Sequence, residues 1–391
     1  MDFRFNPEDE AFRKELVDFI KKELPTDWKG GWDLFAAAED FQEELRWRRK
    51  LADKGWLAMA WPKEYGGQNA SEFSQAILTE EMSYWGAPGQ DIFGVAMLGP
   101  TLMVHGTEEQ KRQFLNRIAK AEMIWCQGYS EPGAGSDLAS LQTKAVLDGD
   151  DYVINGQKIW SSYAQYSDWM FVLARTDPEA PKHKGISFFL VDMKSPGLTV
   201  RPIQEMSGRA HFNEVFFDNV RVPKENVLGE MNRGWYVAMT LLDFERSGVE
   251  HPAYDKRTLE NLVEYAKETK YNGDALIKDP LVRHRLADIA IDIETCRLLA
   301  YRIAWMKSKE MHPNYEASVV RVLNTTTTQR LSNLGLQLLG LLGQLAPGSK
   351  WAPLEGRLEY HYLFSVCYSI ESGTSEIQRN IIAIRGLGLP R

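Results

Sequence analysis

Five short apolar runs interrupt an otherwise helical sequence of 391 residues. Each run is rich in β-branched and aromatic residues and is bounded by Gly, Asp, Asn or Pro, which is typical of strands joined by turns. A succession of such strands predicts an antiparallel β-barrel or sandwich of about 100 residues. The runs are 152–160, 169–176, 186–193, 198–203 and 214–222.

Helical patterns flank these runs on both sides. Near the start, residues 8–24 place Phe12, Leu16 and Ile20 at helical spacing, and Pro25 follows as a stop. Residues 108–122 predict a surface helix. After about residue 232, four further helical stretches follow, and the last of them is long and apolar enough for a bundle core or an oligomer contact.

The chain is too long for one compact core, since single cores rarely exceed about 250–300 residues. The order of patterns predicts an α+β protein with three domains. We expect an N-terminal α-helical domain at 1–122, a middle β domain at 123–232 and a C-terminal four-helix bundle at 233–391. Within the middle domain, 148–160 resembles a hairpin with Asn155–Gly156 as its turn residues.

The composition excludes several classes of function. The net charge of −8 argues against a nucleic-acid partner, because phosphate binding needs basic patches. No run approaches the ~18 apolar residues of a membrane span. The acidic, helical start is unlike a targeting peptide, so cytoplasm, or an organelle matrix after processing, is expected. Scattered histidines and three distant cysteines indicate neither a metal site nor disulfides.

The segment 126–145 is the most distinctive part of the sequence. Gly133 and Gly135 would let the backbone approach a ligand, and Ser130 and Ser136 supply short hydroxyl groups. A cradle for a phosphate or polar ring and an exposed connection between strands fit these residues equally well. Residues 131–137 lie among strands, so this is not a GxGxxG dinucleotide motif.

Two further segments offer candidate side chains. Trp160 is followed by Ser161 and Ser162, which suits a ring stacked on a flat cofactor, although a core tryptophan is the commoner explanation. Glu245 lies between Asp243 and Arg246 on a mostly apolar helix. Burial would raise the pKa of such a carboxyl toward that of a useful base, but a solvent-exposed or ion-paired glutamate is the commoner case.

Near the C-terminus, the sequence ESGTSEIQRN places a glycine turn before an apolar helix. Glu371 and Glu376 flank this turn, and either could be a catalytic base or a charge at a helix start.

Taken together, four segments resemble the acyl-CoA dehydrogenase family in order and spacing. They read YSEPGAGSD, INGQKIW, VFFDNVRVPKENVLGE and GTSEIQRNIIAIRG, and the resemblance covers essentially the whole chain. Among subgroups, the chain is most similar to bacterial enzymes that act on dicarboxylic, ring-bearing or sterol side-chain acyl-CoAs, such as the large subunit of pimeloyl-CoA dehydrogenase.

The resemblance implies an FAD enzyme that removes an α-proton from an acyl-CoA thioester while the β-hydrogen leaves as hydride to flavin N5. It implies that electrons then pass to an electron-transferring flavoprotein. The implied substrate-binding residues are Ser136, Asp243, Arg246 and Ser372. The implied cofactor-binding residues are Gln127, Tyr129, Ser130, Gly135, Ser136, Trp160, Ser162, Gln337, Thr374 and Glu376.

The catalytic base departs from the commonest family pattern. Many members place a carboxylate directly before the Gly-Thr of the C-terminal motif, where this chain has Ser372. A serine hydroxyl is too weakly basic to accept an α-proton. A minority of members place the base on an earlier helix directly before an Arg, and Glu245 matches that position. We therefore expect Glu245 to be the base and the Ser372 N–H to polarise the thioester carbonyl.

Two other departures concern assembly. The Arg that in most homotetrameric members reaches a neighbour's FAD is missing from 267–280. The segment 340–344 reads GLLGQ where relatives have Gly-Gly-Asn-Gly. The resemblance therefore leaves a homotetramer and an α2β2 heterotetramer open. It also leaves open a non-catalytic subunit that completes a partner's FAD site, and an oxidase that uses oxygen.

Overall fold

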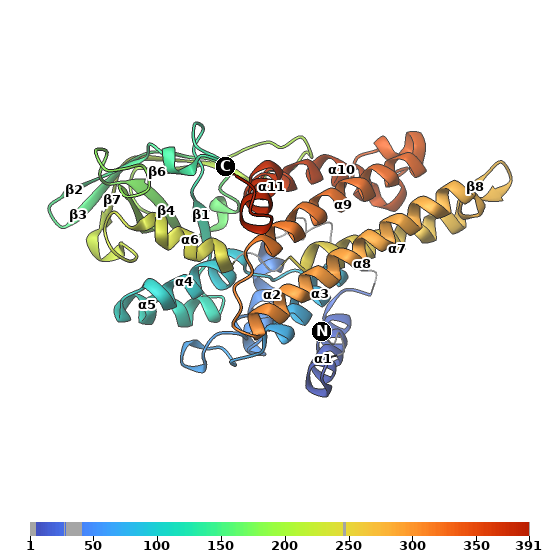
Figure 1. Cartoon of the computed structure of the whole chain (residues 1–391), viewed down its shortest axis with the longest axis horizontal. Coiled ribbons are helices and arrows are strands. Elements are labelled where there is room, and N and C mark those ends of the chain that lie inside the picture. Colours follow the sequence, from blue (N-terminus) through green and yellow to red (C-terminus); the bar gives the residue numbers. More distant parts are fainter. Residues whose placement is uncertain (1–4, 27, 29–40, 245–247, 391) are drawn as a thin grey trace. The chain divides into compact units, whose positions relative to one another are not determined.

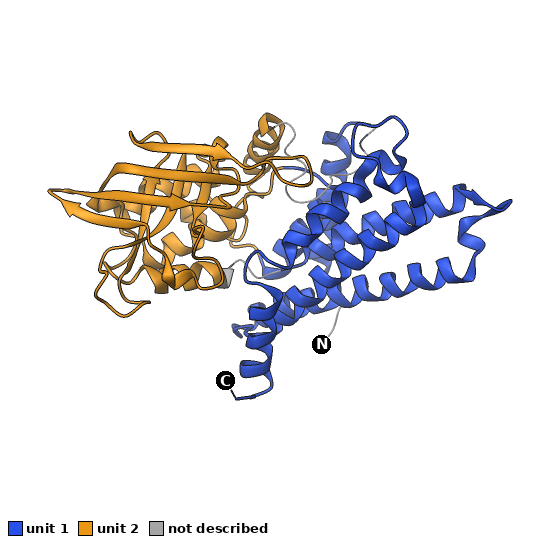
Figure 2. Cartoon of the chain, turned by 90° about the horizontal axis from the view of Figure 1, so that it is seen from above, with its two compact units in different colours: residues 1–40, 71–88, 247–391 blue, residues 41–70, 89–246 orange. Residues whose placement is uncertain are grey.

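The computed structural model describes residues 5–26, 28, 41–244 and 248–390. The chain forms two compact units, each built from segments that are distant in sequence (Figure 2). Unit 1 comprises residues 1–40, 71–88 and 247–391, and unit 2 comprises residues 41–70 and 89–246. Each unit is described by itself below.

The predicted α+β class is confirmed, with helices at both ends of the chain and a sheet in the middle (Figure 1). All five predicted runs form strands. Two further strands of this sheet were not predicted: one has only four residues, and the other, KAVLD, has five residues with no aromatic and a single β-branched residue. The strands are β1 (Trp125–Gly128), β2 (Lys144–Asp148), β3 (Asp151–Lys158), β4 (Trp169–Arg175), β5 (Ile186–Asp192), β6 (Leu198–Pro202) and β7 (Asn213–Pro223).

These strands form one sheet in the order β1-β4-β2-β3-β7-β6, with β5 paired to β4. Most neighbours are antiparallel, as expected, but β4 pairs in parallel with β1 and, at Lys144 and Arg175, with β2. The sheet belongs to unit 2, and most of the candidate cofactor-binding residues lie on β1 or in the segments that follow β1 and β3.

The expected turn at Asn155–Gly156 is wrong. Strand β3 runs straight through both residues, and the hairpin turn from β2 lies instead at 149–150. Gly156 is the site of a register shift in the pairing with β7. A Cβ atom there would lie 2.5 Å from the Thr143 Oγ1 atom, so glycine serves a close approach of two chain segments and not a turn.

The helices of unit 2 that follow residue 98 pack on the sheet through a continuous apolar core (Figure 1). Phe114 lies edge-on to Trp125, and Phe171 stacks on Phe188, with ring centroids 5.3 and 5.8 Å apart. The predicted helix near residue 108 is confirmed, and a capping box formed by Thr107 and Gln110 begins it. The helices are α2 (Phe41–Asp53), α4 (Gly99–His105), α5 (Glu108–Ala119) and α6 (Gly234–Phe244).

Unit 1 is helical, as predicted for both ends of the chain. Helix α9 contacts α7, α8 and α10, which together form the bundle, and the short hairpin of β8 and β9 joins α7 to α8 (Figures 1 and 2). The elements are α1 (Pro7–Glu23), α3 (Glu72–Trp85), α7 (Glu250–Glu268), β8 (Lys270–Tyr271), β9 (Asp274–Ala275), α8 (Pro280–Ser308), α9 (Tyr315–Leu339), α10 (Arg357–Tyr368) and α11 (Ser375–Ile381).

A buried ionic cluster joins three helices of unit 1. Glu80 on α3 accepts hydrogen bonds from Arg13 on α1 and from Arg297 and Tyr301 on α8. Burial raises the pKa of Glu80, but its bonds to Arg297, Tyr301 and Arg13 outweigh burial and hold the pKa below the usual value. Removing one arginine would therefore weaken the docking of α1 on α3 and α8.

None of the helices in the described residues is long and apolar enough to cross a membrane. Over the same part of the chain, no group of three His, Cys, Asp or Glu side chains is arranged to hold a metal ion.

The bundle interior contains a buried acid, Asp255 on α7. Its Oδ2 atom accepts a 2.7 Å hydrogen bond from the Thr328 hydroxyl, and its Oδ1 atom has no hydrogen-bond partner within the described residues. Burial raises the pKa of Asp255 to about 7, although the Thr328 hydrogen bond lowers it. The folded chain therefore binds the carboxyl proton of Asp255 more tightly than the unfolded chain does. The contribution of Asp255 to the free energy of unfolding falls as the pH rises from about 4 through 7.

We predict that Asp255→Asn increases stability at pH 8 by up to roughly 3 kcal/mol, because the amide has no charge to bury. The gain should shrink as the pH falls toward 5. Thermal or urea unfolding at both pH values measures it. Asp292→Asn, at a partly exposed carboxylate that pairs with Arg330, is the control and should show no such pH dependence. An equal effect of Asp255→Asn at pH 5 and pH 8 would refute the prediction.

Candidate functional site

The glycine-containing loop after β1 is open at its tip and fixed at its base. Gly135 and Ser136 are exposed, and a Cβ atom built on Gly133 or Gly135 would have no atom within 4 Å. At the base, the Glu131 N–H and carbonyl each pair with Ala134. The tip can therefore accept a ligand close to its backbone.

A single carboxylate closes this loop. Glu131 accepts hydrogen bonds from the backbone N–H groups of Gln142 and Thr143, at 2.6 and 2.9 Å. It also pairs at 2.8 Å with the Nζ atom of Lys158 at the end of β3, and that Nζ donates to the Tyr129 carbonyl at 3.0 Å. The pair thus joins the chain entering the loop, the chain leaving it and the adjacent strand.

Both members of this pair are shielded from water, and Lys158 is 0% exposed. Burial lowers the pKa of Lys158 to about 8, while Glu131 opposes that change. Burial also raises the pKa of Glu131, but Lys158, Thr143 and Gln142 hold it below the usual value. Both groups are therefore charged at pH 7.

The turn after β3 presents Trp160 beside the loop. The Ile159 N–H donates to the Ser130 carbonyl at 2.9 Å, which holds the two segments together. Trp160 has a φ of 61° and is 56% exposed, whereas Ser161 and Ser162 are buried. The core position, which is the commoner place for a tryptophan, is excluded, and an exposed ring is available for stacking.

Gln127 and Tyr129 complete the candidate cofactor residues of unit 2. Tyr129 is buried in the core, with its ring edge-on to Phe171. The Gln127 Nε2 atom is buried and has no hydrogen-bond partner within the described residues. A buried donor normally has a partner, which a bound ligand or a water molecule can supply. This donor, the open loop and the exposed Trp160 suit a large cofactor with polar edges and a flat ring, as FAD has.

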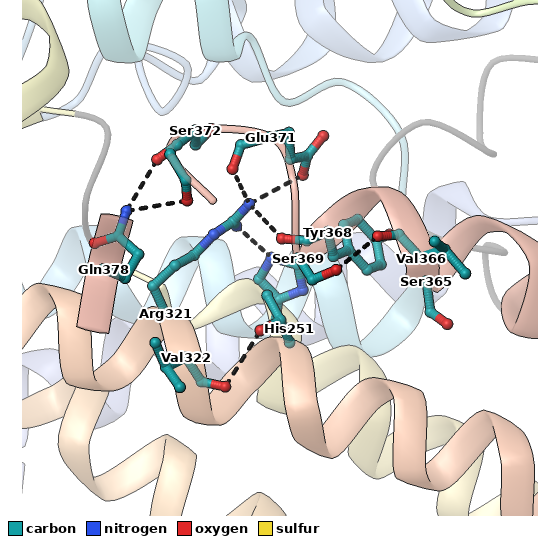
Figure 3. Close-up of polar contacts among 12 residues, drawn as sticks. His251, Arg321, Val322, Ser365, Val366, Tyr368, Ser369, Glu371, Ser372 and Gln378 are labelled. Atoms are coloured by element: carbon teal, nitrogen blue, oxygen red, sulfur yellow. Dashed lines mark hydrogen bonds and ion pairs between the residues drawn. The ribbon is translucent and has the colours of Figure 1, made fainter. Parts of the chain in front are cut away.

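The glycine turn of unit 1 lies at the start of α11. Ser372 and Gly373 have φ values of 51° and 91°, and the Thr374 hydroxyl caps the helix by accepting from the Ile377 N–H at 3.3 Å. The Gln378 side chain donates to the Ser372 and Gly373 carbonyls at 3.1 and 3.2 Å (Figure 3). Ser372 and Glu376 are both exposed.

Arg321 on α9 holds the chain just before that turn (Figure 3). Its Nη2 atom donates to the carbonyls of Tyr368 and Glu371, at 3.0 and 3.1 Å, and lies 3.3 Å from a Glu371 carboxylate oxygen. Its Nη1 atom lies 3.5 Å from His251 Nε2. Burial and the adjacent Arg321 lower the pKa of His251 to about 3, so this imidazole is neutral and accepts. Glu371 is thus occupied by a structural contact.

The remaining candidate residues from the sequence lie outside the loop after β1, the Trp160 turn and the C-terminal turn. Gln337 is exposed on α9, where its side chain bonds to Arg285 and Asn333. Asp243 lies within α6. Glu245 and Arg246 lie outside the described residues.

Comparison with known proteins gives the family directly. The chain matches the models for the acyl-CoA dehydrogenase N-terminal, middle and C-terminal domains over residues 6–122, 126–220 and 232–387. It belongs to the acyl-CoA dehydrogenase family.

Named members of the family are similar over nearly the full length. Acyl-CoA dehydrogenase IpdE1 of Mycobacterium tuberculosis is 42% identical, with 90% of each chain covered. The solved ChsE4-ChsE5 complex from Mycobacterium tuberculosis has a TM-score of 0.90 at 36% identity, and a solved steroid ACAD, Tcur3481-Tcur3483, has 0.90 at 35%. Both solved structures cover 100% of this chain and match it over 100% of their own.

In this acyl-CoA dehydrogenase, sequence reasoning located the loop, Trp160 and the C-terminal turn, but missed the side chains that hold them. The Glu131–Lys158 pair joins residues 27 apart, and Arg321 lies 47 residues from Tyr368. One signal could have indicated the first pair. A strand that alternates Ile154, Gly156 and Lys158 on one face places a charge where an apolar residue is expected, which implies a buried partner.

We predict that Lys158→Met destabilises unit 2 by about 3–5 kcal/mol, because the Glu131 carboxylate stays buried without its cation. Thermal unfolding measures the loss, and Lys158→Met with Glu131→Gln should recover part of it. Lys182→Met removes an exposed pair with Asp137 on the same loop and should cost about 1 kcal/mol or less. Equal losses for Lys158→Met and Lys182→Met would contradict a structural role for the buried pair.

Proposed function

We propose that this chain is an FAD-dependent dehydrogenase that converts an acyl-CoA thioester to the trans-2-enoyl-CoA. One observation carries the proposal within a chain of this family. Trp160 is exposed next to an open glycine loop, and the buried Gln127 donor in the same unit has no hydrogen-bond partner within the described residues. Buried polar groups are normally paired, so this arrangement supports a bound cofactor.

Ser130, Gly135, Ser136, Trp160, Ser162 and Gln127 are the residues of unit 2 that we propose for the cofactor. In unit 1, the family resemblance implies Thr374, Glu376 and Gln337 as cofactor-binding residues. When bound, FAD would supply a hydride acceptor for the β-hydrogen of the substrate. The exposed tip of the loop leaves Ser136 available to both the cofactor and the thioester.

We propose Glu245 as the base that removes the α-proton. Ser372 occupies the commonest position of the base and cannot perform this step, because its hydroxyl is too weakly basic. Glu371 is already engaged by Arg321. What remains for the Ser372 turn is its backbone N–H, which would polarise the thioester carbonyl and stabilise the charge that develops on that oxygen. Asp243 and Arg246 would line the pantetheine channel.

The substrate we propose is a ring-bearing or otherwise bulky acyl-CoA, and the electron acceptor an electron-transferring flavoprotein. The similarity to a solved steroid ACAD supports the first part. Straight, branched and dicarboxylic acyl-CoAs are the alternatives.

We propose further that the chain works in an α2β2 assembly with a different subunit, in preference to a homotetramer. The segment 340–344 supports this, because Leu341 is 85% exposed and Leu342 replaces the family's Asn. The solved ChsE4-ChsE5 structure is a complex of two named chains. If the chain purified alone contains one FAD per chain and is active, this part of the proposal is wrong.

A second candidate is a non-catalytic subunit that completes a partner's FAD site. The same exposed Leu341 is the observation that favours it. Activity that requires the partner chain, but not Glu245 of this chain, would select this alternative.

We predict that Glu245→Gln retains FAD but loses flavin bleaching by substrate by at least about 10³-fold, because a carboxamide cannot accept the proton. Anaerobic mixing with an acyl-CoA measures the bleaching. Glu264→Gln, at an exposed glutamate on α7, is the control and should bleach at the wild-type rate. Loss of bleaching in Glu371→Gln but not in Glu245→Gln would move the base to the C-terminal turn.

A further inference from the structure

The turn that presents Trp160 contains two residues in an unfavourable backbone conformation. Trp160 and Tyr163 have φ values of 61° and 59°, in the left-handed region. Gly, Asn and Asp tolerate this region, but bulky residues rarely adopt it, since their Cβ atom crowds the following carbonyl. Such conformations persist only where surrounding contacts fix them, and they concentrate at functional sites. Something must therefore hold this turn.

Asn213, the first residue of β7, makes most of the contacts that do so. Its carbonyl accepts from the Ser161 N–H at 3.0 Å, and its side-chain Nδ2 donates to the Ser161 carbonyl at 2.9 Å. Both peptide groups of Ser161 are thereby fixed by one residue, between the two left-handed positions.

The neighbours of Asn213 extend this hold. The His211 carbonyl accepts from the Tyr163 N–H at 3.1 Å, and the Phe212 ring lies edge-on to Trp160, with centroids 5.9 Å apart. The Asn213 Nδ2 atom also bonds to the Gln165 side chain, just beyond the turn. Residues at the start of β7 thus contact the turn along its whole length and hold its conformation.

The chemistry of Asn213 at this position is specific. The residue is 0% exposed, and its Oδ1 atom has no hydrogen-bond partner within the described residues. Burying an unpaired acceptor is unfavourable, so a position that served strand packing alone would favour an apolar side chain. Unlike an apolar side chain, Asn213 provides the Nδ2 donor that fixes the Ser161 carbonyl.

We propose that Asn213 is a positioning residue for the cofactor: it holds the 160–163 turn in its left-handed form and so sets where Trp160 and Ser162 meet the flavin. This inference rests on the proposed FAD function. It assigns to Asn213 an effect on flavin binding and environment that exceeds its effect on folding.

The test is Asn213→Asp, which keeps the volume of the side chain, removes the donor and turns a carboxylate oxygen toward the Ser161 carbonyl. FAD release on dilution of the holoprotein gives the dissociation constant, and flavin fluorescence reports quenching by a stacked Trp160. We expect FAD binding to weaken by at least about tenfold and bound-flavin fluorescence to rise, because the loss of one buried hydrogen bond alone accounts for about tenfold and repulsion between the two oxygens adds to it. Asn219→Asp, at an exposed position of β7 with a φ of 51°, is the matched control and should change neither.

Trp160→Ala separates this inference from the function it rests on. If Trp160→Ala weakens FAD binding and Asn213→Asp does not, Asn213 has no positioning role and the proposed flavin contact of Trp160 stands. If Trp160→Ala also leaves FAD binding and fluorescence unchanged, that contact is wrong and the inference falls with it. A variant that loses folding stability but binds FAD like the wild type, or one that does not fold, makes Asn213 a structural residue and overturns the inference.

Discussion

The buried ion pair of Glu131 and Lys158 is the interaction on which the rest of the candidate site in unit 2 depends. An exposed pair of this kind contributes little, but a fully buried one must keep both partners, because either charge alone would be strongly destabilising inside the sheet. Loss of either partner would therefore destabilise the closed loop. Because the pair also fixes the Tyr129 carbonyl, the register of the loop against β3 is determined before any ligand binds.

In both units, hydrogen bonds fix the ends of a loop or turn while its tip stays exposed. In unit 2, buried polar contacts hold the loop and the Trp160 turn, while Ser136 and Trp160 remain exposed. In unit 1, Arg321 and Gln378 fix the backbone on either side of Ser372, which is itself exposed. Preorganised backbone of this kind avoids reorganisation during reaction, and this is how a polarising N–H contributes most.

How much the sequence could predict depends on how local each signal is. Helix α1 has its own cap, with Asn6 accepting from Asp9, and strands β4 and β5 are continuous apolar runs, so short windows were enough to locate them. The prediction of a turn at Asn155–Gly156 was wrong because the pairing of β3 with β7 overrides the local turn preference of these residues. Arg321 and Asn213 could not be found, since an arginine or asparagine shows its role only through partners that the fold brings near.

We propose that this chain carries its own proton acceptor at Glu245. The most direct test follows the proton itself: FAD-loaded protein is mixed in D2O with an acyl-CoA that has no transferable β-hydrogen, and α-hydrogen exchange is measured by NMR. We expect exchange in the wild type and none in Glu245→Gln. Exchange that persists in Glu245→Gln, or its absence from wild-type protein that holds both FAD and thioester, would mean that Glu245 does not remove the α-proton.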